Sequence, residues 1–215
     1  MRKFIIAVFV ISILSSCNNQ SSKDAGSANQ SVQQTENKKM DFNILDAYKL
    51  TLEKTFLYGD YSNFISVIGL PDSVTVFKTK FLIDSKAALE KAVLTAKDPD
   101  VVTLHYPGID MWYSYNNSII PFTIDFRKTT KSVSYGETLF DSNYTFEQFK
   151  RQFPISATPS VQMPGSLFGL ATKEKGEKFK HFLLKRKSKD DPNAEPLVEF
   201  TFENNKLIFV MFANF

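Results

Sequence analysis

Cysteine is almost absent from this 215-residue sequence, which holds only Cys17. No disulfide can form within one chain, so the folded state depends on its hydrophobic core. Histidine is nearly as scarce, and neither His105 nor His181 stands in a His-x-x-His, Cys-x-x-Cys or His-Glu-x-x-His pattern. The sequence thus offers no metal motif, and we expect neither a metal nor a cofactor.

Catalytic motifs are missing as well. No glycine-rich phosphate loop follows a strand, and Gly165-Ser166-Leu167 lacks the second half of a Gly-x-Ser-x-Gly elbow. Asp191, Asn193 and Glu195 alternate like the start of a calcium loop, but its glycine and closing glutamate are absent. An enzyme with an acid–base pair among scattered carboxylates is our third hypothesis, and the sequence favours a protein without enzyme activity.

No hydrophobic run is long enough to cross a bilayer as a helix, which takes about 20 residues. Phe4–Leu14 is apolar apart from Ser12 and follows the basic pair Arg2 and Lys3. A short apolar segment behind positive charge is typical of a signal peptide. We therefore interpret residues 1–16 as a signal peptide.

Leu14-Ser15-Ser16-Cys17 resembles the bacterial lipobox, in which a branched apolar residue and two small residues precede a cysteine. The resemblance implies that Cys17 becomes the lipidated first residue, with a diacylglyceryl group on sulfur and an acyl chain such as palmitate on its amino group. It places the protein on the cell membrane or outer membrane, facing the periplasm or the exterior. The alternative is an ordinary secretory signal with an incidental cysteine.

Removal of the signal peptide changes the charge. Arg2 and Lys3 leave with it, so 24 Lys and Arg remain against 23 Asp and Glu. The isoelectric point of 8.8 for the full sequence is therefore no argument for a nucleic-acid partner, and we expect none.

Residues 17–40 lack the apolar side chains that a packed structure needs. Between Asn18 and Lys39 the apolar residues are Ala25, Ala28 and Val32. Such a composition cannot offset the entropy of ordering, so we predict a disordered tether with a span of roughly 25 Å.

The remaining chain predicts an α+β fold of short helices packed on antiparallel sheet meanders. Apolar residues at three- and four-residue spacing predict a helix that begins at Asp41 and ends at Gly59; they are Phe42, Leu45, Tyr48, Leu52 and Phe56. Further helices are expected at 62–68 and 85–97, and after the capping box Thr145–Gln148. Strands are expected at 73–83, 101–106, 111–115, 119–127, 131–139, 178–187, 197–202 and 206–213.

Two stretches of the chain look alike. Pro121–Phe126 and Pro196–Phe202 each precede a polar turn and a further strand, and each follows an aromatic helix that ends before a proline. We interpret residues 41–140 and 141–215 as two tandem α+β units. The alternative is a chance likeness between short strands.

The segment Phe64–Pro71, a short helix that ends in Gly-x-Pro before a strand, carries a further resemblance. With the duplicated layout, it resembles the β-lactamase-inhibitor-protein-like fold, which also occurs in the small lipoprotein of the outer-membrane barrel-assembly machine. This resemblance covers roughly residues 41–215 and implies a protein-binding or assembly role.

An aromatic stretch provides the candidate partner site, which comprises Trp112, Tyr113, Tyr115, His105 and Tyr106. Alternation places Tyr113 and Tyr115 on one face of a strand and Trp112 on the other. One face should be core, and the other could present aromatic surface, which binding hot spots favour. The alternative is ordinary sheet packing.

A basic stretch provides the second candidate surface, which comprises Lys178, Lys180, Lys185, Arg186 and Lys187. These residues could face anionic lipid headgroups beside the anchor. The alternative is an edge strand that lysines protect from sheet-to-sheet association.

These observations favour a lipid-anchored, non-enzymatic envelope protein that binds another envelope protein through an aromatic sheet face. The alternative is a lipoprotein that binds a small molecule or glycan in an apolar pocket lined by some of its 21 phenylalanines. The first hypothesis expects an open aromatic surface, and the second an enclosed cavity.

Overall fold

The computed structural model describes residues 42–94, 102–114, 117–158, 179–187 and 196–213. Residues 39–215 form one compact unit. Its fold is α+β and mostly β, as the sequence predicts at this level. The expected signal peptide, Cys17 and the expected tether lie outside the described residues.

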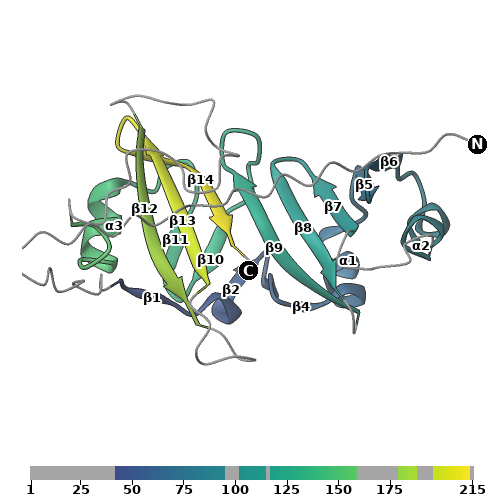
Figure 1. The fold of residues 1–215 in the computed structure, drawn as a ribbon, viewed down its shortest axis with the longest axis horizontal. Coiled ribbons are helices and arrows are strands. Elements are labelled where there is room, and N and C mark those ends of the chain that lie inside the picture. The colour runs from purple at the N-terminus through teal and green to yellow at the C-terminus, as the bar shows by residue number, and fades with distance from the viewer. Residues whose placement is uncertain (1–41, 95–101, 115–116, 159–178, 188–195, 214–215) are drawn as a thin grey trace, which may run out of the picture. The chain divides into compact units, whose positions relative to one another are not determined.

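Most strands belong to a ten-stranded sheet with the order β1-β12-β13-β14-β9-β8-β7-β5-β6, in which β4 pairs with β9 (Figure 1). Its strands are β1 (Ile44–Leu45), β4 (Gly59–Asp60), β5 (Ser73–Val76), β6 (Thr79–Leu82), β7 (Val102–Tyr106), β8 (Ile109–Ser114), β9 (Ser118–Asp125), β12 (Phe179–Arg186), β13 (Leu197–Glu203) and β14 (Lys206–Phe212). All pairings are antiparallel except that of β1 with β12.

A second, four-stranded sheet has the order β11-β10-β2-β3. Its strands are β2 (Leu50–Leu52), β3 (Thr55–Phe56), β10 (Val133–Tyr135) and β11 (Thr138–Phe140). The described helices are η1 (Ala47–Lys49), α1 (Tyr61–Ile68), α2 (Lys86–Leu94) and α3 (Phe146–Gln152). None of these helices has the length and apolar run that a membrane crossing requires.

Two meanders, β7–β8–β9 and β12–β13–β14, meet through their last strands. Strand β14 pairs with β9 between Phe209 and Asp125, Val210 and Ile124, and Met211 and Thr123. The boundary expected between residues 140 and 141 falls between β11 and α3. Both sides of that boundary contribute strands to one sheet and side chains to one core.

The helix expected between Asp41 and Gly59 is wrong. This stretch forms β1, η1, β2, β3 and β4. Leu50 and Leu52 alternate inwards on β2, where the strand pairs with β10. Positive φ angles at Glu53 (46°) and Lys54 (71°) turn the chain into β3. Strand pairing with distant residues therefore overrides the helical spacing of the apolar side chains.

Two expected strands are hairpins. The stretch 73–83 divides into β5 and β6 around Phe77, whose φ is 55°. The stretch 131–139 divides into β10 and β11 around Gly136, whose φ is 60°. The second hairpin belongs to the four-stranded sheet because β10 pairs with β2 rather than with the meander.

Local signals at helix and hairpin ends are confirmed. Thr145 and Gln148 form the capping box of α3. Gly69 ends α1 with a φ of 94°. The polar turn expected after Pro196–Phe202 contains Asn204 and Asn205, which take positive φ angles of 49° and 68° between β13 and β14.

An aromatic cluster holds α3 on the ten-stranded sheet. Phe149 is fully buried, and its ring centroid lies 5.3–6.2 Å from those of five other phenylalanines, Phe146, Phe153, Phe182, Phe200 and Phe202. Between the two sheets, a void of only about 10 Å³ remains, and Phe140, Phe200 and Phe212 are among the residues that line it. A water molecule needs at least about that much space, so the phenylalanines fill the core instead of lining a ligand cavity there.

We expect Phe149→Ala to lower the free energy of unfolding by about 3–5 kcal/mol, because it removes a ring from a packed core. Phe56→Ala is the matched control, since Phe56 is 54% exposed, and it should cost about 0.5 kcal/mol. Urea denaturation measures both variants. Equal losses in the two would contradict the packing described for α3.

Candidate functional site

The residues of the aromatic stretch divide between the two faces of the sheet. Tyr106 points into the core, where it packs edge-on against Phe64 and its hydroxyl donates to the carbonyl of Gly69 at 3.3 Å. Tyr113 also lies on the core side. His105 and Trp112 project from the opposite face, which we call the outer face. Tyr115 lies outside the described residues. The structure therefore does not bring the described members together in one surface.

Trp112 lies against Phe122 on the outer face. Their rings are stacked, with centroids 4.3 Å apart and planes 18° apart. Phe122 in turn packs against Phe209 and Met211 of β14. Trp112 thus contacts an apolar cluster that spans the junction between the two meanders.

His105 belongs to a row of hydrogen bonds across four strands. Its Nδ1 lies 2.7 Å from an oxygen of Asp110, and its Nε2 lies 2.8 Å from the hydroxyl of Thr75. Thr123 donates to the other oxygen of Asp110 at 3.1 Å. A carboxylate only accepts, so neutral His105 donates from Nδ1 and accepts the Thr75 hydroxyl at Nε2.

This row has the hydroxyl–imidazole–carboxylate order of a nucleophilic triad. Acyl transfer also requires free N–H donors beside the hydroxyl. Strand β5, which carries Thr75, is paired by β6 on one edge and by β7 on the other. Its backbone donors are thus engaged in the sheet, which favours a cross-strand structural role for the row.

His181 occupies a similar but buried arrangement on the second meander. Its Nδ1 lies 3.0 Å from both the Glu199 carboxylate and the Thr201 hydroxyl, and all three residues are at most 2% exposed. Sequence reasoning missed both carboxylate partners. Asp110 is five positions from His105 across the Pro107–Gly108 turn and was open to inference, whereas the pairing of His181 with Glu199 requires the strand register.

The residues of the basic stretch also divide between the faces. Lys180 and Arg186 point towards the core side, where Lys180 lies 5.0 Å from the Phe146 ring centroid. Arg186 donates to the Tyr58 hydroxyl at 2.5 Å. Burial raises the pKa of Tyr58 to about 12, although Arg186 opposes the increase.

Lys185 lies near the end of β12, and Lys187 follows the last residue of that strand. Lys185 stands 6.0 Å from the Phe42 ring centroid, and Lys187 pairs with Asp46 at 3.7 Å. Lys178 lies outside the described residues. The described basic residues therefore contact several different partners and do not form one continuous patch.

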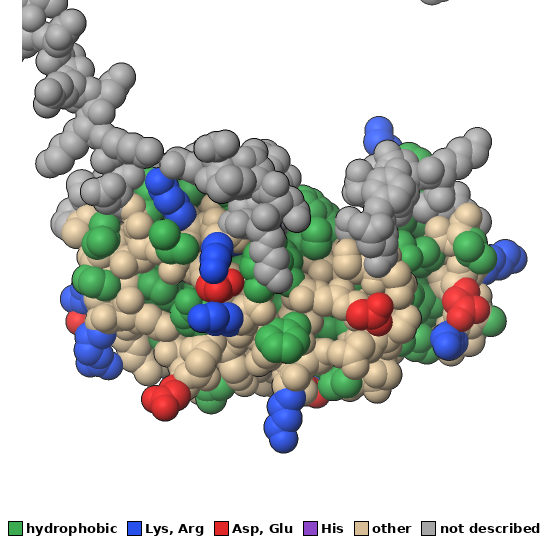
Figure 2. All heavy atoms as spheres, turned by 90° about the horizontal axis from the view of Figure 1, so that it is seen from below, with side chains coloured by type: hydrophobic (Ala, Val, Ile, Leu, Met, Phe, Trp, Pro, Cys, Tyr) green, Lys and Arg blue, Asp and Glu red, His purple; other side chains and the backbone are tan. Residues whose placement is uncertain are grey.

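The candidate partner site lies instead between α1 and α2, and we call it the α1–α2 groove. It has a volume of about 490 Å³. Its walls and floor are lined by Tyr61, Ser62, Ile65, Ser66, Lys86, Leu89, Glu90, Val93, Leu94, Tyr113 and Asn117. Figure 2 views the unit from below the orientation of Figure 1 and shows that hydrophobic side chains reach the surface on that face.

Local sequence positions both walls of the groove. Asp60 caps α1 by accepting from the backbone N–H of Asn63 at 2.8 Å, which fixes the start of the helix beside β8. Tyr61 then packs edge-on against Tyr113, with ring centroids 4.9 Å apart. On α2, Leu89 is buried, whereas Leu94 at the helix end is 83% exposed.

The groove is electrically neutral overall. Burial raises the pKa of Tyr61 above its ordinary value, and Tyr113 and Glu90 raise it further, so the hydroxyl stays protonated. Lys86 and Glu90 pair on the rim at 3.9 Å, and both are exposed. An arrangement with an apolar floor and balanced rim charges suits an uncharged, apolar surface. Within the part of the chain that the structure describes, no group of three or more His, Cys, Asp or Glu residues could hold a metal ion.

Asp125 provides a charged anchor at the centre of the outer face. Both its oxygens accept from the Arg127 guanidinium, at 2.9 and 3.0 Å, and Lys128 lies 3.0 Å from one of them. Burial alone would raise the pKa of Asp125, but the hydrogen bonds from Arg127 and Lys128 outweigh it and hold the pKa below its ordinary value.

We expect Asp125→Asn to destabilise the fold by about 1–3 kcal/mol at neutral pH, because it weakens charge-assisted hydrogen bonds. A lowered folded-state pKa stabilises the fold above the unfolded pKa of about 4 and loses that effect as the pH falls. The difference from wild type should therefore shrink below about pH 4. Denaturation at several pH values measures it, with the exposed Asp84→Asn as control. A difference that is constant with pH would contradict this assignment.

Comparisons with known proteins show no relative of this chain. No family model matches the chain, and no curated protein or solved structure matches it either. The resemblance to the β-lactamase-inhibitor-protein-like fold thus stays a prediction. The function of the chain has to be argued from its own residues.

Proposed function

We propose that this protein is a lipid-anchored, non-enzymatic protein of the cell envelope that binds another envelope protein through the α1–α2 groove. The observation that carries the proposal is the open apolar groove over Tyr61 and Tyr113. Tyrosine is enriched among binding hot spots, because it combines a large apolar ring with one polar group.

Exposed apolar side chains on α1, just after it and at the end of α2 support a protein as the partner. Leu94 is 83% exposed at the end of α2, Val67 is 47% exposed on α1, and Leu70 is 37% exposed just after α1. Apolar residues that gather at one end of a folded unit are typical of an interaction surface. The near-complete filling of the space between the sheets favours this proposal over an enclosed ligand cavity in the core.

Anchoring by Cys17 supports the envelope location, on the cell membrane or outer membrane and facing the periplasm or the exterior. The proposal of an anchor rests on the lipobox-like segment Leu14–Cys17 and on the apolar run that leads into it. We further propose that the two meanders derive from one duplicated unit. A helix precedes each meander, and each has a histidine on its first strand paired with a carboxylate on its second.

Cys17→Ser should release the protein from the membrane fraction, since it removes the sulfur that carries the lipid. Ser16→Ala is the matched control, because it keeps a small residue before the cysteine and should preserve anchoring. Membrane fractionation and metabolic labelling with a fatty acid measure both variants. Fatty-acid labelling of the Cys17→Ser chain would count against the anchor.

Leu94→Glu should reduce partner binding at least about tenfold, because it places a charge against an apolar interface. Ile155→Glu is the matched control, since Ile155 is also apolar and exposed but follows α3. A photo-crosslinking side chain at position 94 or 155 in the full lipidated chain, followed by mass spectrometry, identifies what each site touches.

The expected result is one protein that crosslinks from position 94, is lost from Leu94→Glu and is retained by Ile155→Glu. Its binding should change little as salt is added, because the groove carries balanced charge. Equal recovery from both variants, or a small molecule bound in the α1–α2 groove in place of a protein, would refute the proposed function.

A further inference from the structure

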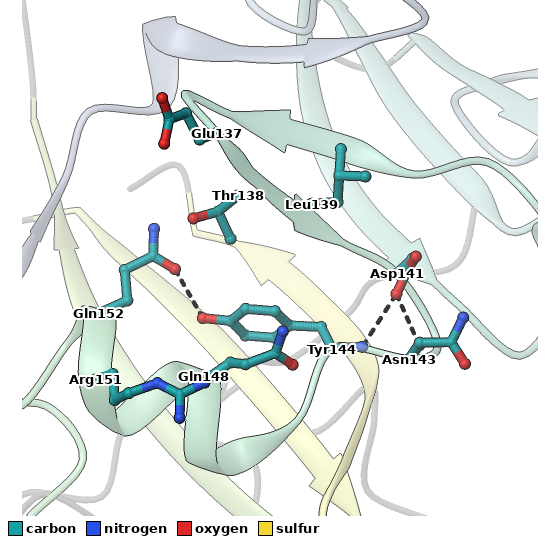
Figure 3. A pocket seen from close by; sticks show the side chains of 9 residues that line it. All are labelled: Glu137, Thr138, Leu139, Asp141, Asn143, Tyr144, Gln148, Arg151 and Gln152. Carbon is teal, nitrogen blue, oxygen red and sulfur yellow. Dashed lines mark hydrogen bonds between the residues drawn. The ribbon is translucent and has the colours of Figure 1, made fainter.

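A second concave site lies between α3 and the β10–β11 hairpin, far along the chain from the α1–α2 groove. Its volume is about 560 Å³, within the range of small-molecule sites. Figure 3 shows side chains from three neighbouring stretches that face it: the hairpin, the turn around Asp141, and the second half of α3. All lie between Glu137 and Gln152.

The α3 wall of this pocket presents hydrogen-bond donors. The side-chain oxygen of Gln148 accepts from the backbone N–H and the hydroxyl of Thr145, at 2.7 and 3.0 Å. The side-chain oxygen of Gln152 accepts from the Tyr144 hydroxyl at 2.8 Å (Figure 3). With both oxygens engaged, each amide group has its nitrogen left to donate.

Tyr144 and Arg151 complete the donor wall, the first by orienting Gln152 and the second by adding a guanidinium group. Burial raises the pKa of Tyr144, so its hydroxyl remains protonated and continues to orient Gln152. Arg151 stands between the two glutamines on α3 and forms no ion pair with any residue in the described ranges. Its guanidinium therefore adds donors to the same wall.

The opposite wall presents acceptors. One oxygen of Asp141 accepts from the backbone N–H groups of Asn143 and Tyr144, at 2.7 and 3.0 Å, which fixes the carboxylate and leaves its second oxygen available. Glu137 and the hydroxyl of Thr138 lie on the same side (Figure 3). Donors thus face acceptors across the pocket.

The charges argue against an anionic ligand. Arg151 is one cation, whereas Glu137 and Asp141 are two carboxylates. Because carboxylates line one wall and Arg151 lines the other, a ligand of either charge would face a like charge on one of the two walls. A hydroxyl both donates and accepts, so a ligand with several hydroxyls satisfies both walls without carrying charge.

We propose that this pocket binds an uncharged saccharide. The lining favours a sugar over a peptide. The exposed apolar side chain of the pocket is that of Leu139, whereas a peptide would need pockets for several apolar side chains. The saccharide site shares no residue with the α1–α2 groove, so the two proposals stand or fall separately.

The test uses the full lipidated chain in detergent and two probes, maltose and N,N′-diacetylchitobiose, titrated while ligand-observed NMR is recorded. A sedimentation assay with purified cell-wall glycan forms a second arm and separates a free sugar from a polymer-borne one as the source. Sodium phosphate and a short neutral peptide serve as competing ligand classes.

Arg151→Met and Gln152→Leu should each weaken saccharide binding at least about tenfold, since each removes fixed donors. Lys150→Met is the matched control, because Lys150 is the adjacent cation on α3 and pairs with Glu147 at 2.7 Å outside the pocket. Thermal denaturation of all variants checks that the fold is intact, and Leu94→Glu should bind saccharide as wild type does.

Saccharide binding that Arg151→Met abolishes and Lys150→Met preserves supports the proposal, in whichever arm it is seen. Binding that is equal in these two variants would overturn it. So would binding of phosphate or the peptide alone, and so would an absence of saccharide binding in both arms.

Discussion

The antiparallel pairing of β9 with β14 is the interaction on which the rest of the fold depends. It joins two meanders into one sheet, so that one face carries the core and the other carries the polar row around His105. Asp125 lies on β9 at this junction and accepts from Arg127 and Lys128. Without the pairing, the strands that support α1 and those that support α3 would belong to separate small sheets.

Sequence signals that act within a few residues predicted the structure well. The capping box at Thr145 and the turn at Asn204 need only local hydrogen bonds and permitted φ angles. The helix expected from Asp41 failed for the opposite reason, because Leu50 and Leu52 are fixed by pairing with a strand more than 80 positions away. The turn at Phe77 left no compositional signal, since phenylalanine rarely takes a positive φ.

The candidate sites show the same limit. The aromatic stretch predicted Tyr113 as a site residue, and Tyr113 does form the floor of the α1–α2 groove. The partner of Tyr113 is Tyr61 from another helix, which periodicity could not indicate. The saccharide pocket is different, because its residues lie within one short stretch from Glu137 to Gln152. The sequence alone did not reveal this pocket, because its amide donors are defined only when Tyr144 and Thr145 donate to the side-chain oxygens of the two glutamines.

Strand β1 is the first strand of the described chain and gives it a defined mechanical entry point. The backbone N–H of Lys185 donates to the backbone carbonyl of Asn43 at 3.0 Å, and Asn43 exchanges two hydrogen bonds with Ser156, at 2.9 and 3.0 Å. If the proposed lipid at Cys17 anchors the chain, tension between that lipid and a partner enters the fold here. Strand β1 pairs with β12 at Ile44 and Leu45, so such a pull first loads these two pairs together with the hydrogen bonds between Asn43 and Ser156.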